Sequence, residues 1–198
     1  MSAAKFDDIM VDLETLGSRA GCQIISIGAA RFSRSSEVAI GETFYTLCSL
    51  HKDNQAELGL STDESTLTWW KGQSAEARTA LTEAKRKNAP HLTNALAEFA
   101  RFVGWTDSKG LGDARVWGNG SDFDCAILYA AYAAVGEPVP WKFWNTRCFR
   151  TLKSEFPGVP KPERKGTHHN ALDDAIYQAE HAAVIFRSLA AAQPRRGV

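Results

Sequence analysis

One short segment places two carboxylates within a run of residues that otherwise has the composition of a buried strand. It reads Met10-Val-Asp-Leu-Glu-Thr-Leu-Gly17, so Asp12 and Glu14 are two residues apart. Side chains alternate between the two faces of a strand, which puts both carboxylates on one face. The segment therefore predicts a strand that presents a pair of acids together.

Two further aspartates stand at the start of a helix predicted for residues 122–135. Ile127 and Leu128 should face the core, so Asp124, about one turn before them, projects near the end of the sheet that carries the first two acids. Asp122 lies near the helix N-terminus, where an acid suits free backbone amides and the helix dipole. We therefore take Asp124 as the candidate metal ligand of the two.

A histidine and an aspartate, His169 and Asp174, are separated by five residues. In one continuous helix their side chains would point about 140° apart and could not converge. We therefore place His169 on the loop before a helix of residues 170–191, with Asn170 near its cap and Asp174 in its first turns. Both side chains can then reach one cleft, and we expect the histidine to be mobile.

Four acids and one histidine in three short segments suit a two-metal phosphodiesterase site. Hard cations such as Mg²⁺ and Mn²⁺ prefer oxygen ligands and keep several waters. A pair of them can activate water, compensate phosphate charge and stabilise the departing oxyanion. A lone histidine beside them is better placed as a proton acceptor than as a ligand. A zinc hydrolase is disfavoured, because histidine and thiolate ligands at zinc spacing are absent from the sequence.

The order Asp-x-Glu, Asn-Gly-x-x-Phe-Asp and His-x-x-x-x-Asp resembles the DEDDh, or ribonuclease H-like, family of 3′-5′ exonucleases over most of the chain. A second segment, Trp69-Trp-Lys-Gly-Gln73, resembles the Trp-Trp-x-x-Gln segment of a branch that contains phage DNA exonucleases and a mycobacterial exoribonuclease. The resemblance implies that His169 deprotonates the attacking water. It also implies that two metal ions are held by Asp12, Glu14, Asp124 and Asp174.

The same resemblance implies an α/β fold, with a mixed five-stranded sheet of three antiparallel and two parallel strands flanked by helices. One segment, residues 145–151, departs from the Arg-Asp-x-Arg-Thr pattern of this branch, because Cys148 stands where an aspartate is expected. The role of this segment is left open. Hydrophobic periodicity independently predicts strands at residues 6–13, 23–32, 42–48, 116–117 and 141–145, and helices at 61–103 with a break at Pro90, 148–155 and 170–191.

The length of 198 residues and the 44% hydrophobic content fit one globular domain, which we place at residues 1–192 with a frayed tail at 193–198. Asp7 and Asp8 interrupt the region where a secretory signal would be apolar, so we expect a cytoplasmic protein with no membrane partner. The four cysteines form no Cys-x-x-Cys pair. With 23 basic and 23 acidic residues the net charge is zero, and any affinity for nucleic acid must be local.

Basic residues near His169 are candidates to line the approach of a nucleic-acid strand, although a solvated loop would explain them equally well. They are Lys161, Arg164 and Lys165 on the preceding loop, and Arg147 and Arg150, which we assign to the short helix before it. The adjacent Trp69 and Trp70 should point about 100° apart on a helix, with Trp70 in the core and Trp69 able to stack on a base. The residues predicted to contact substrate are Thr15, Leu16, Trp69, Asn119, Arg150 and Lys165.

These observations favour a metal-dependent enzyme that removes nucleoside 5′-monophosphates from the 3′ end of single-stranded nucleic acid. DNA is the favoured substrate, and RNA is the alternative because nothing in the sequence identifies a group that reads the 2′-hydroxyl. An alternative of another class is a catalytically silent nucleic-acid-binding module. Its expected mark is a missing carboxylate or histidine, and all five are present. The sequence leaves the oligomeric state open, with a homodimer as the candidate.

Overall fold

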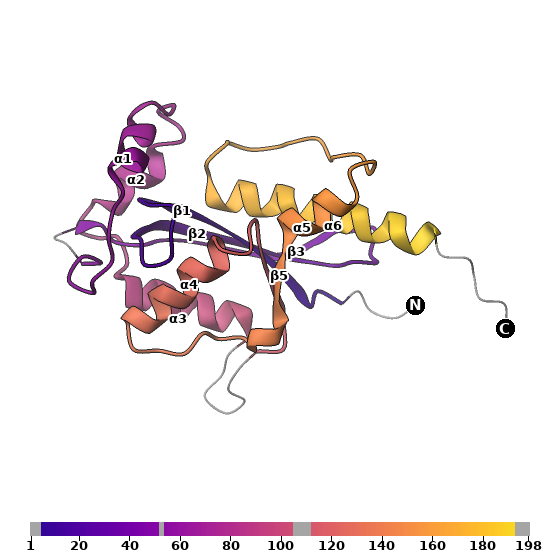
Figure 1. Cartoon of the computed structure of the whole chain (residues 1–198), viewed down its shortest axis with the longest axis horizontal. Helices are drawn as coiled ribbons and strands as arrows, with labels where there is room; N and C mark the ends of the chain where they lie inside the picture. Colours follow the sequence, from indigo (N-terminus) through magenta and orange to yellow (C-terminus); the bar gives the residue numbers. More distant parts are fainter. Residues whose placement is uncertain (1–4, 52–53, 105–111, 193–198) are drawn as a thin grey trace.

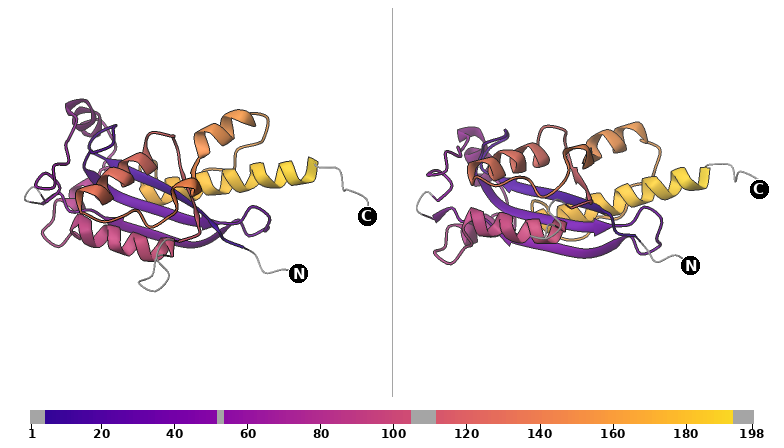
Figure 2. Two further views of the ribbon diagram at one scale, coloured as in Figure 1. Left: turned by 60° about the horizontal axis from the view of Figure 1, so that its bottom comes forward. Right: turned by 90° about the horizontal axis from the view of Figure 1, so that it is seen from below.

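A twisted sheet lies between two layers of helices in the computed structural model, which describes residues 5–51, 54–104 and 112–192 (Figure 1). Helices α3 (Leu92–Val103) and α4 (Asp124–Ala134) cover one face. Helix α6 (Ala171–Ala192) covers the other, with α5 beside it (Figures 1 and 2). The tail predicted at 193–198 lies outside the described residues.

The sheet has five strands in the order β3-β2-β1-β4-β5. Strands β1, β2 and β3 pair antiparallel, whereas β4 pairs parallel with β1 and β5 pairs parallel with β4. This confirms the expected mixed sheet of three antiparallel and two parallel strands. The strands are β1 (Asp8–Thr15), β2 (Ile24–Phe32), β3 (Ile40–Leu47), β4 (Arg115–Gly118) and β5 (Thr146–Cys148).

The central strand β1 is covered on both faces, and its alternating side chains divide between two cores. Ile9 and Val11 pack in the cluster that contains the apolar side chains of α3 and α4. Met10 packs in the cluster made with α6. Because the alternation continues along the strand, Asp12 and Glu14 share the face of Met10 and are directed to the side of α6.

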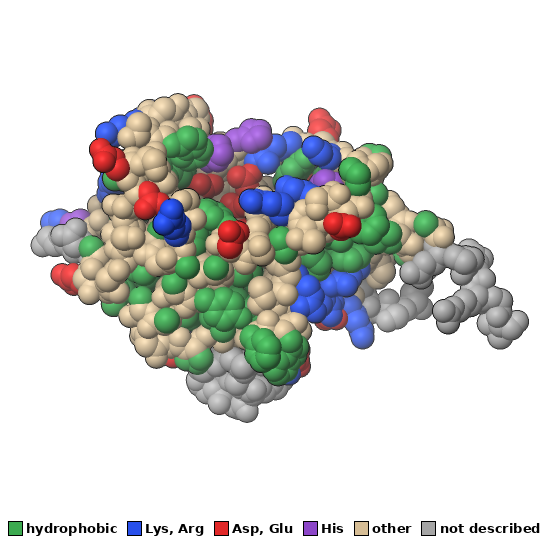
Figure 3. Space-filling view, in the orientation of Figure 1, with side chains coloured by type: hydrophobic (Ala, Val, Ile, Leu, Met, Phe, Trp, Pro, Cys, Tyr) green, Lys and Arg blue, Asp and Glu red, His purple; other side chains and the backbone are tan. Residues whose placement is uncertain are grey.

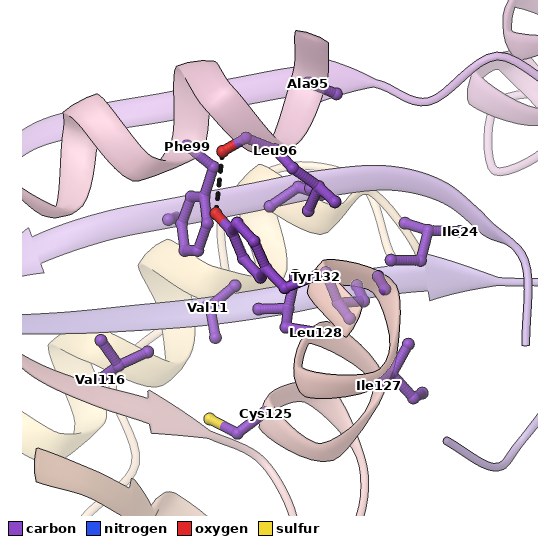
Figure 4. Close-up of a cluster of buried hydrophobic side chains, with 14 of the residues drawn as sticks. Val11, Ile24, Ala95, Leu96, Phe99, Val116, Cys125, Ile127, Leu128 and Tyr132 are labelled. Atoms are coloured by element: carbon purple, nitrogen blue, oxygen red, sulfur yellow. Dashed lines mark hydrogen bonds between the residues drawn. The ribbon is translucent and has the colours of Figure 1, made fainter. Parts of the chain in front are cut away.

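The position of α4 is fixed by its packing on α3. Leu128 of α4 and Leu96 of α3 belong to one buried cluster, and the Tyr132 hydroxyl donates a 2.8 Å hydrogen bond to the Leu96 carbonyl (Figure 4). A buried tyrosine hydroxyl needs such a partner. The contact anchors the C-terminal half of α4, and the N-terminus of the helix then carries Asp124 to the end of β1.

The close approach of α6 to the sheet depends on small residues on both sides. A Cβ atom built on Gly28 of β2 would lie 2.1 Å from the backbone of Ala171, so only glycine fits beneath the start of the helix. Along the helix, the side chains that meet the sheet are alanines with no exposed surface. The helix can therefore lie flat on the sheet, with its first turns beside β1. These alanines are Ala175, Ala179, Ala182 and Ala183.

The middle third of the chain is helical, as predicted, and contains one more break than expected. Helices α1 (Glu64–Lys71) and α2 (Thr79–Ala84) are separate, and Pro90 precedes α3. The later short helix α5 (Phe149–Glu155) lies close to its predicted position. None of the helices in the described ranges is long and apolar enough to cross a membrane.

The strand predicted at residues 141–145 is wrong, because β5 begins only at Thr146. Residues Phe143–Asn145 form a 3₁₀ turn instead, and Trp141 makes an isolated bridge. The Trp141 ring is anchored in the core, whereas both Phe143 and Trp144 are exposed, so the side chains do not alternate as a strand requires. Arg147 accordingly lies on β5 and not on the helix to which we assigned it.

Candidate active site

The predicted acids and the histidine come together where β1 ends, around a cavity of about 520 Å³. Asp12 and Glu14 reach it from β1, Asp174 from the first turns of α6, and His169 from the loop before α6. Asp124 lies buried at the start of α4, next to the first two acids. In Figure 3 acidic side chains occupy a hollow, with histidine and basic side chains at its rim.

The Asp124 carboxylate is held by the backbone around it. Its two oxygens accept hydrogen bonds from the backbone N–H groups of Leu13, at 3.2 Å, and Asn119, at 2.7 Å. Burial raises the pKa of Asp124 to about 6, and these hydrogen bonds oppose the rise. The neighbouring Asp122 is exposed, and Phe123 takes the cap position of α4, so the capping that we expected of Asp122 is not seen.

The two acids at the C-terminal end of β1, Asp12 and Glu14, lie in an environment that disfavours their charge. Burial raises the pKa of Glu14 to about 8, and the charge of Asp124 contributes to the rise. The pKa of Asp12 is also well above its ordinary value because of burial and the charges of Asp124 and Glu14. Gln178 of α6 donates a 2.7 Å hydrogen bond from Nε2 to Asp12 Oδ1. A bound cation would relieve this accumulation of negative charge.

A third acid on the same face of β1 shows what a structural carboxylate looks like here. Asp8 accepts two hydrogen bonds from Arg34, two from Arg115 and one from the indole of Trp117, all between 2.7 and 2.8 Å. Burial alone would raise the pKa of Asp8, but these donors outweigh it and the pKa is lowered. Asp8 therefore has its counterions within the protein, whereas no ion pair joins Asp12 or Glu14 to a basic side chain among the described residues.

Asp174 joins α6 to the histidine loop. Its Oδ2 accepts a 3.2 Å hydrogen bond from the backbone N–H of His169, and its Oδ1 pairs with Arg164. Asn170 caps α6 by accepting hydrogen bonds from the backbone N–H groups of Leu172 and Asp173, which confirms the expected cap. The loop therefore brings His169 to the cavity that Asp174 lines, as the spacing of five residues predicted.

His169 has a left-handed backbone, with φ of 62°, which is uncommon for a residue other than glycine. Its ring packs edge-on against Trp69, with 4.8 Å between the ring centroids. Burial lowers the pKa of His169, and the charges of His168 and Arg164 lower it further. The imidazole is therefore neutral at neutral pH and able to accept a proton. Its mobility stays a prediction.

The donor set fits a divalent cation. One carboxylate oxygen each from Glu14 and Asp174 and one ring nitrogen of His169 lie within 4.8 Å of one another. Two of these three donors are carboxylate oxygens, the ligand type that Mg²⁺ and Mn²⁺ prefer. Gln178 Oε1 is buried and has no hydrogen-bond partner among the described residues, although Nε2 of the same amide is bonded. An acceptor left over at this point suits a water or ion in the cavity.

The six predicted substrate contacts divide evenly. Thr15, Trp69 and Asn119 line the cavity, whereas Leu16, Arg150 and Lys165 do not. Leu16 is buried against Trp70 in a small core cluster. Lys165 lies at a separate depression that also holds Glu163 and Glu180. Arg150 lies in a neighbouring recess.

The two tryptophans behave as predicted. Trp70 is only 2% exposed, and its indole donates a 2.8 Å hydrogen bond to the Thr15 carbonyl at the end of β1. Trp69 is 43% exposed and stands at the cavity beside His169. One ring therefore fixes helix α1 to the sheet, and the other is free to contact a ligand.

Several cavity residues escaped the sequence reasoning. Gln178 and His181 lie four and seven residues after Asp174, so a helix places all three on one face, and this spacing could have revealed them. His168, which we set aside as a neighbour of the functional pair, also lines the cavity. Lys153 reaches it from α5 by donating a 3.2 Å hydrogen bond to Asn119 Oδ1. No spacing in the sequence indicates that contact.

The unexpected Cys148 has a local structural role. Its Sγ accepts a hydrogen bond from the backbone N–H of Thr151, at 3.4 Å, and so caps the start of α5. An aspartate would provide a stronger cap at this position. The departure from the pattern of the branch therefore affects the helix end, and Cys148 does not line the acidic cavity.

Comparison with solved structures identifies the fold. The nuclease domain of 3′hExo, described as a DEDDh family member bound to rAMP, superposes with a TM-score of 0.56 and 12% identity over 96% of each chain. Exonuclease X, solved with 5′-overhanging duplex DNA, gives a TM-score of 0.52 and 13% identity over 94% of this chain and 93% of that chain. Both share the ribonuclease H-like arrangement of sheet and helices.

Sequence comparison identifies the family. The exodeoxyribonuclease of Enterobacteria phage T4 is 27% identical over an alignment of 165 residues, and the match covers 73% of this chain and 69% of the phage protein. A family model described as the 3′-5′ exoribonuclease Rv2179c-like domain matches residues 7–186. The resemblance to 3′-5′ exonucleases of DEDDh type is thereby confirmed, and the chain belongs to the Rv2179c-like family of 3′-5′ exoribonuclease domains.

Proposed function

We propose that this protein is a two-metal-dependent 3′-5′ exonuclease that releases nucleoside 5′-monophosphates from single-stranded nucleic acid. The observation that carries the proposal is that Asp12, Glu14, His169 and Asp174 line one cavity, with Asp124 buried next to the first two. In this proposal His169 is the general base. The metal ligands are Asp12, Glu14, Asp124 and Asp174.

Each protein group has a distinct task in the reaction. Divalent cations held by the carboxylates would lower the pKa of water and offset charge on the phosphate. The carboxylates fix where that charge lies, and the backbone hydrogen bonds to Asp124 keep its oxygens oriented. Neutral His169 takes the proton of the attacking water. Gln178 holds Asp12 Oδ1, which prevents that side chain from rotating out of the cavity.

The lining of the cavity suits the end of a nucleic-acid strand. Trp69 and Thr66 bound it at the end near α1, where an exposed aromatic ring can stack on a terminal base. Lys153 and Lys161 line the end near α5, where cations can contact the backbone. The terminal base thus has an aromatic contact at one end of the cavity, and the backbone on its 5′ side has cationic side chains at the other. Stacking tolerates any base, so we propose cleavage without strong sequence preference.

Two nucleic acids that differ in their sugar, DNA and RNA, are candidates for the preferred substrate. We keep single-stranded DNA as the first, and the similarity to a phage exodeoxyribonuclease supports it. RNA is the second candidate, supported by the description of the family as exoribonuclease domains. A protein distinguishes the two through the 2′-hydroxyl of the terminal nucleotide. Relative rates on matched strands measure this preference directly.

The test of the proposed function uses one DNA and one RNA strand of the same sequence, each with a free or a blocked 3′ end. Products are followed by size with Mg²⁺, with Mn²⁺ and with a chelator. We expect mononucleotide release from free 3′ ends only, and only with a divalent ion. The Asp124→Asn variant should lose at least a hundredfold in rate. Cleavage from 5′ ends, or parental rates in this variant, would contradict the proposal.

A further inference from the structure

A second recess opens beside the acidic cavity, under α5 and the loop that leads to α6. It has a volume of about 330 Å³ and no carboxylate in its lining. Its ionisable side chains are Arg150, Lys153, Lys161 and His181, and we call this set the basic recess. Lys153, Lys161 and His181 also line the acidic cavity, so the two hollows adjoin. Figure 3 shows basic side chains beside the acidic hollow.

The groups of the basic recess are held in place by contacts with the fold. The Lys153 ammonium donates to Asn119 Oδ1 at 3.2 Å and lies 5.1 Å from the centre of the Phe149 ring. The His181 ring packs edge-on against the same phenyl group, with 5.5 Å between centroids, and is 5% exposed. The side chain of Lys153 is therefore fixed at the boundary between the two hollows.

The charges of the basic recess are not matched by carboxylates in its lining. Burial lowers the pKa of Lys153, and the charges of Arg150 and Lys161 lower it further. Burial also lowers the pKa of His181, again with contributions from Lys153 and Lys161. Within the described ranges, no ion pair joins a side chain of the recess to a carboxylate. Cations that repel one another in a partly buried recess favour binding of an anion.

We propose that the basic recess binds the first phosphodiester on the 5′ side of the scissile linkage. This inference rests on the proposed function, because it takes the acidic cavity as the place where the terminal nucleotide is cleaved. With the terminal base at Trp69 of α1, a backbone that crosses the cavity towards α5 would meet Lys153 and Lys161 (Figure 1). Contacts with phosphate position a strand without reading its sequence.

The test compares Lys153→Gln and Lys161→Gln with the parent on two substrates. The p-nitrophenyl ester of thymidine 5′-monophosphate has a scissile ester and no phosphodiester on its 5′ side, whereas a DNA pentamer has both. We expect KM for the pentamer to rise about tenfold in each variant, with KM for the ester unchanged. The salt dependence of pentamer KM should also weaken by roughly 0.7 in logarithmic slope per lost contact.

A pentamer with a neutral methylphosphonate at the linkage next to the scissile one locates the contact. For the parent, KM should be about tenfold higher on this substrate than on the unmodified pentamer. Lys161→Gln should raise KM little further, because the interaction is already absent. Lys87→Gln, an exposed residue outside both hollows, is the matched control and should behave as the parent.

Four results separate the possible failures. Parental KM on the pentamer in both variants, or an equal rise on the ester, would overturn the phosphate subsite. A further tenfold rise in KM for Lys161→Gln on the methylphosphonate pentamer would also overturn it. A parent protein that hydrolyses neither substrate, and no RNA pentamer of matched sequence, would instead contradict the proposed function. Lys161 is exposed and on a loop, so its variant tests the inference even if Lys153→Gln does not fold.

Discussion

Replacing Glu14 by glutamine should stabilise the metal-free protein, although it removes a proposed ligand. The pKa of Glu14 is about 8 in the folded protein and 4.5 as its ordinary value. A carboxyl whose pKa is raised by folding contributes full stability below the lower value, and this stability is lost as the pH rises towards the higher one. At pH 7 the ionisation of Glu14 lowers the free energy of unfolding by roughly 3 kcal/mol, and above pH 8 this reduction approaches about 5 kcal/mol. Glutamine carries no charge and avoids this cost.

The assay is urea unfolding followed by tryptophan fluorescence at pH 5, 7 and 8.5, with a chelator or with Mn²⁺. We expect the advantage of Glu14→Gln to grow with pH in chelator. Mn²⁺ at a hundred times its dissociation constant should stabilise the parent by about 2.7 kcal/mol and the variant far less. Glu57→Gln makes the same change at an exposed site and should stay within about 0.5 kcal/mol of the parent. A variant no more stable than the parent at pH 8.5, with an equal response to Mn²⁺, would refute this reasoning.

Three further changes test other parts of the structure. His169→Ala should slow turnover by roughly 10² to 10⁴. In the parent, the rate should fall with decreasing pH below 6.5, and this fall should disappear in the variant. Parental rates across the pH range would show that His169 has no part in catalysis. Asp8→Asn should cost about 3 to 5 kcal/mol in urea unfolding at pH 7. Because folding lowers the pKa of Asp8, the difference in free energy of unfolding between the parent and Asp8→Asn should shrink as the pH falls below 3.8. A difference that persists at low pH would exclude the charge of Asp8 as its cause. Gly28→Ala should cost about 1 to 3 kcal/mol in the same assay, because its Cβ would meet the backbone of α6; unchanged stability would show that the helix can move.

The sequence predicted the site better than it predicted the site's surroundings. The paired acids were found because strand alternation is a strict geometric rule, and Asp12 and Glu14 do share a face. His169 was placed correctly because five residues cannot bring two side chains together within one helix. Strand alternation and helical rotation depend only on local geometry, which a single sequence contains.

The errors came from contacts between distant segments. Nothing near Lys153 indicates that its ammonium reaches Asn119, which lies 34 residues earlier, and nothing near Lys165 indicates that it turns away from the cavity. The strand expected at residues 141–145 failed because apolar composition alone cannot separate a short strand from a turn anchored by one buried ring. Tertiary packing decides these cases.

Diffraction from a crystal soaked in Mn²⁺ and a nucleoside 5′-monophosphate, recorded at the manganese absorption edge, tests the central claim most directly. We expect two anomalous peaks in the cavity at the end of β1, with carboxylate oxygens of Asp12, Glu14, Asp124 and Asp174 as ligands and the phosphate bound beside the ions. A cavity without manganese, or ions bound only elsewhere on the protein, would contradict that claim.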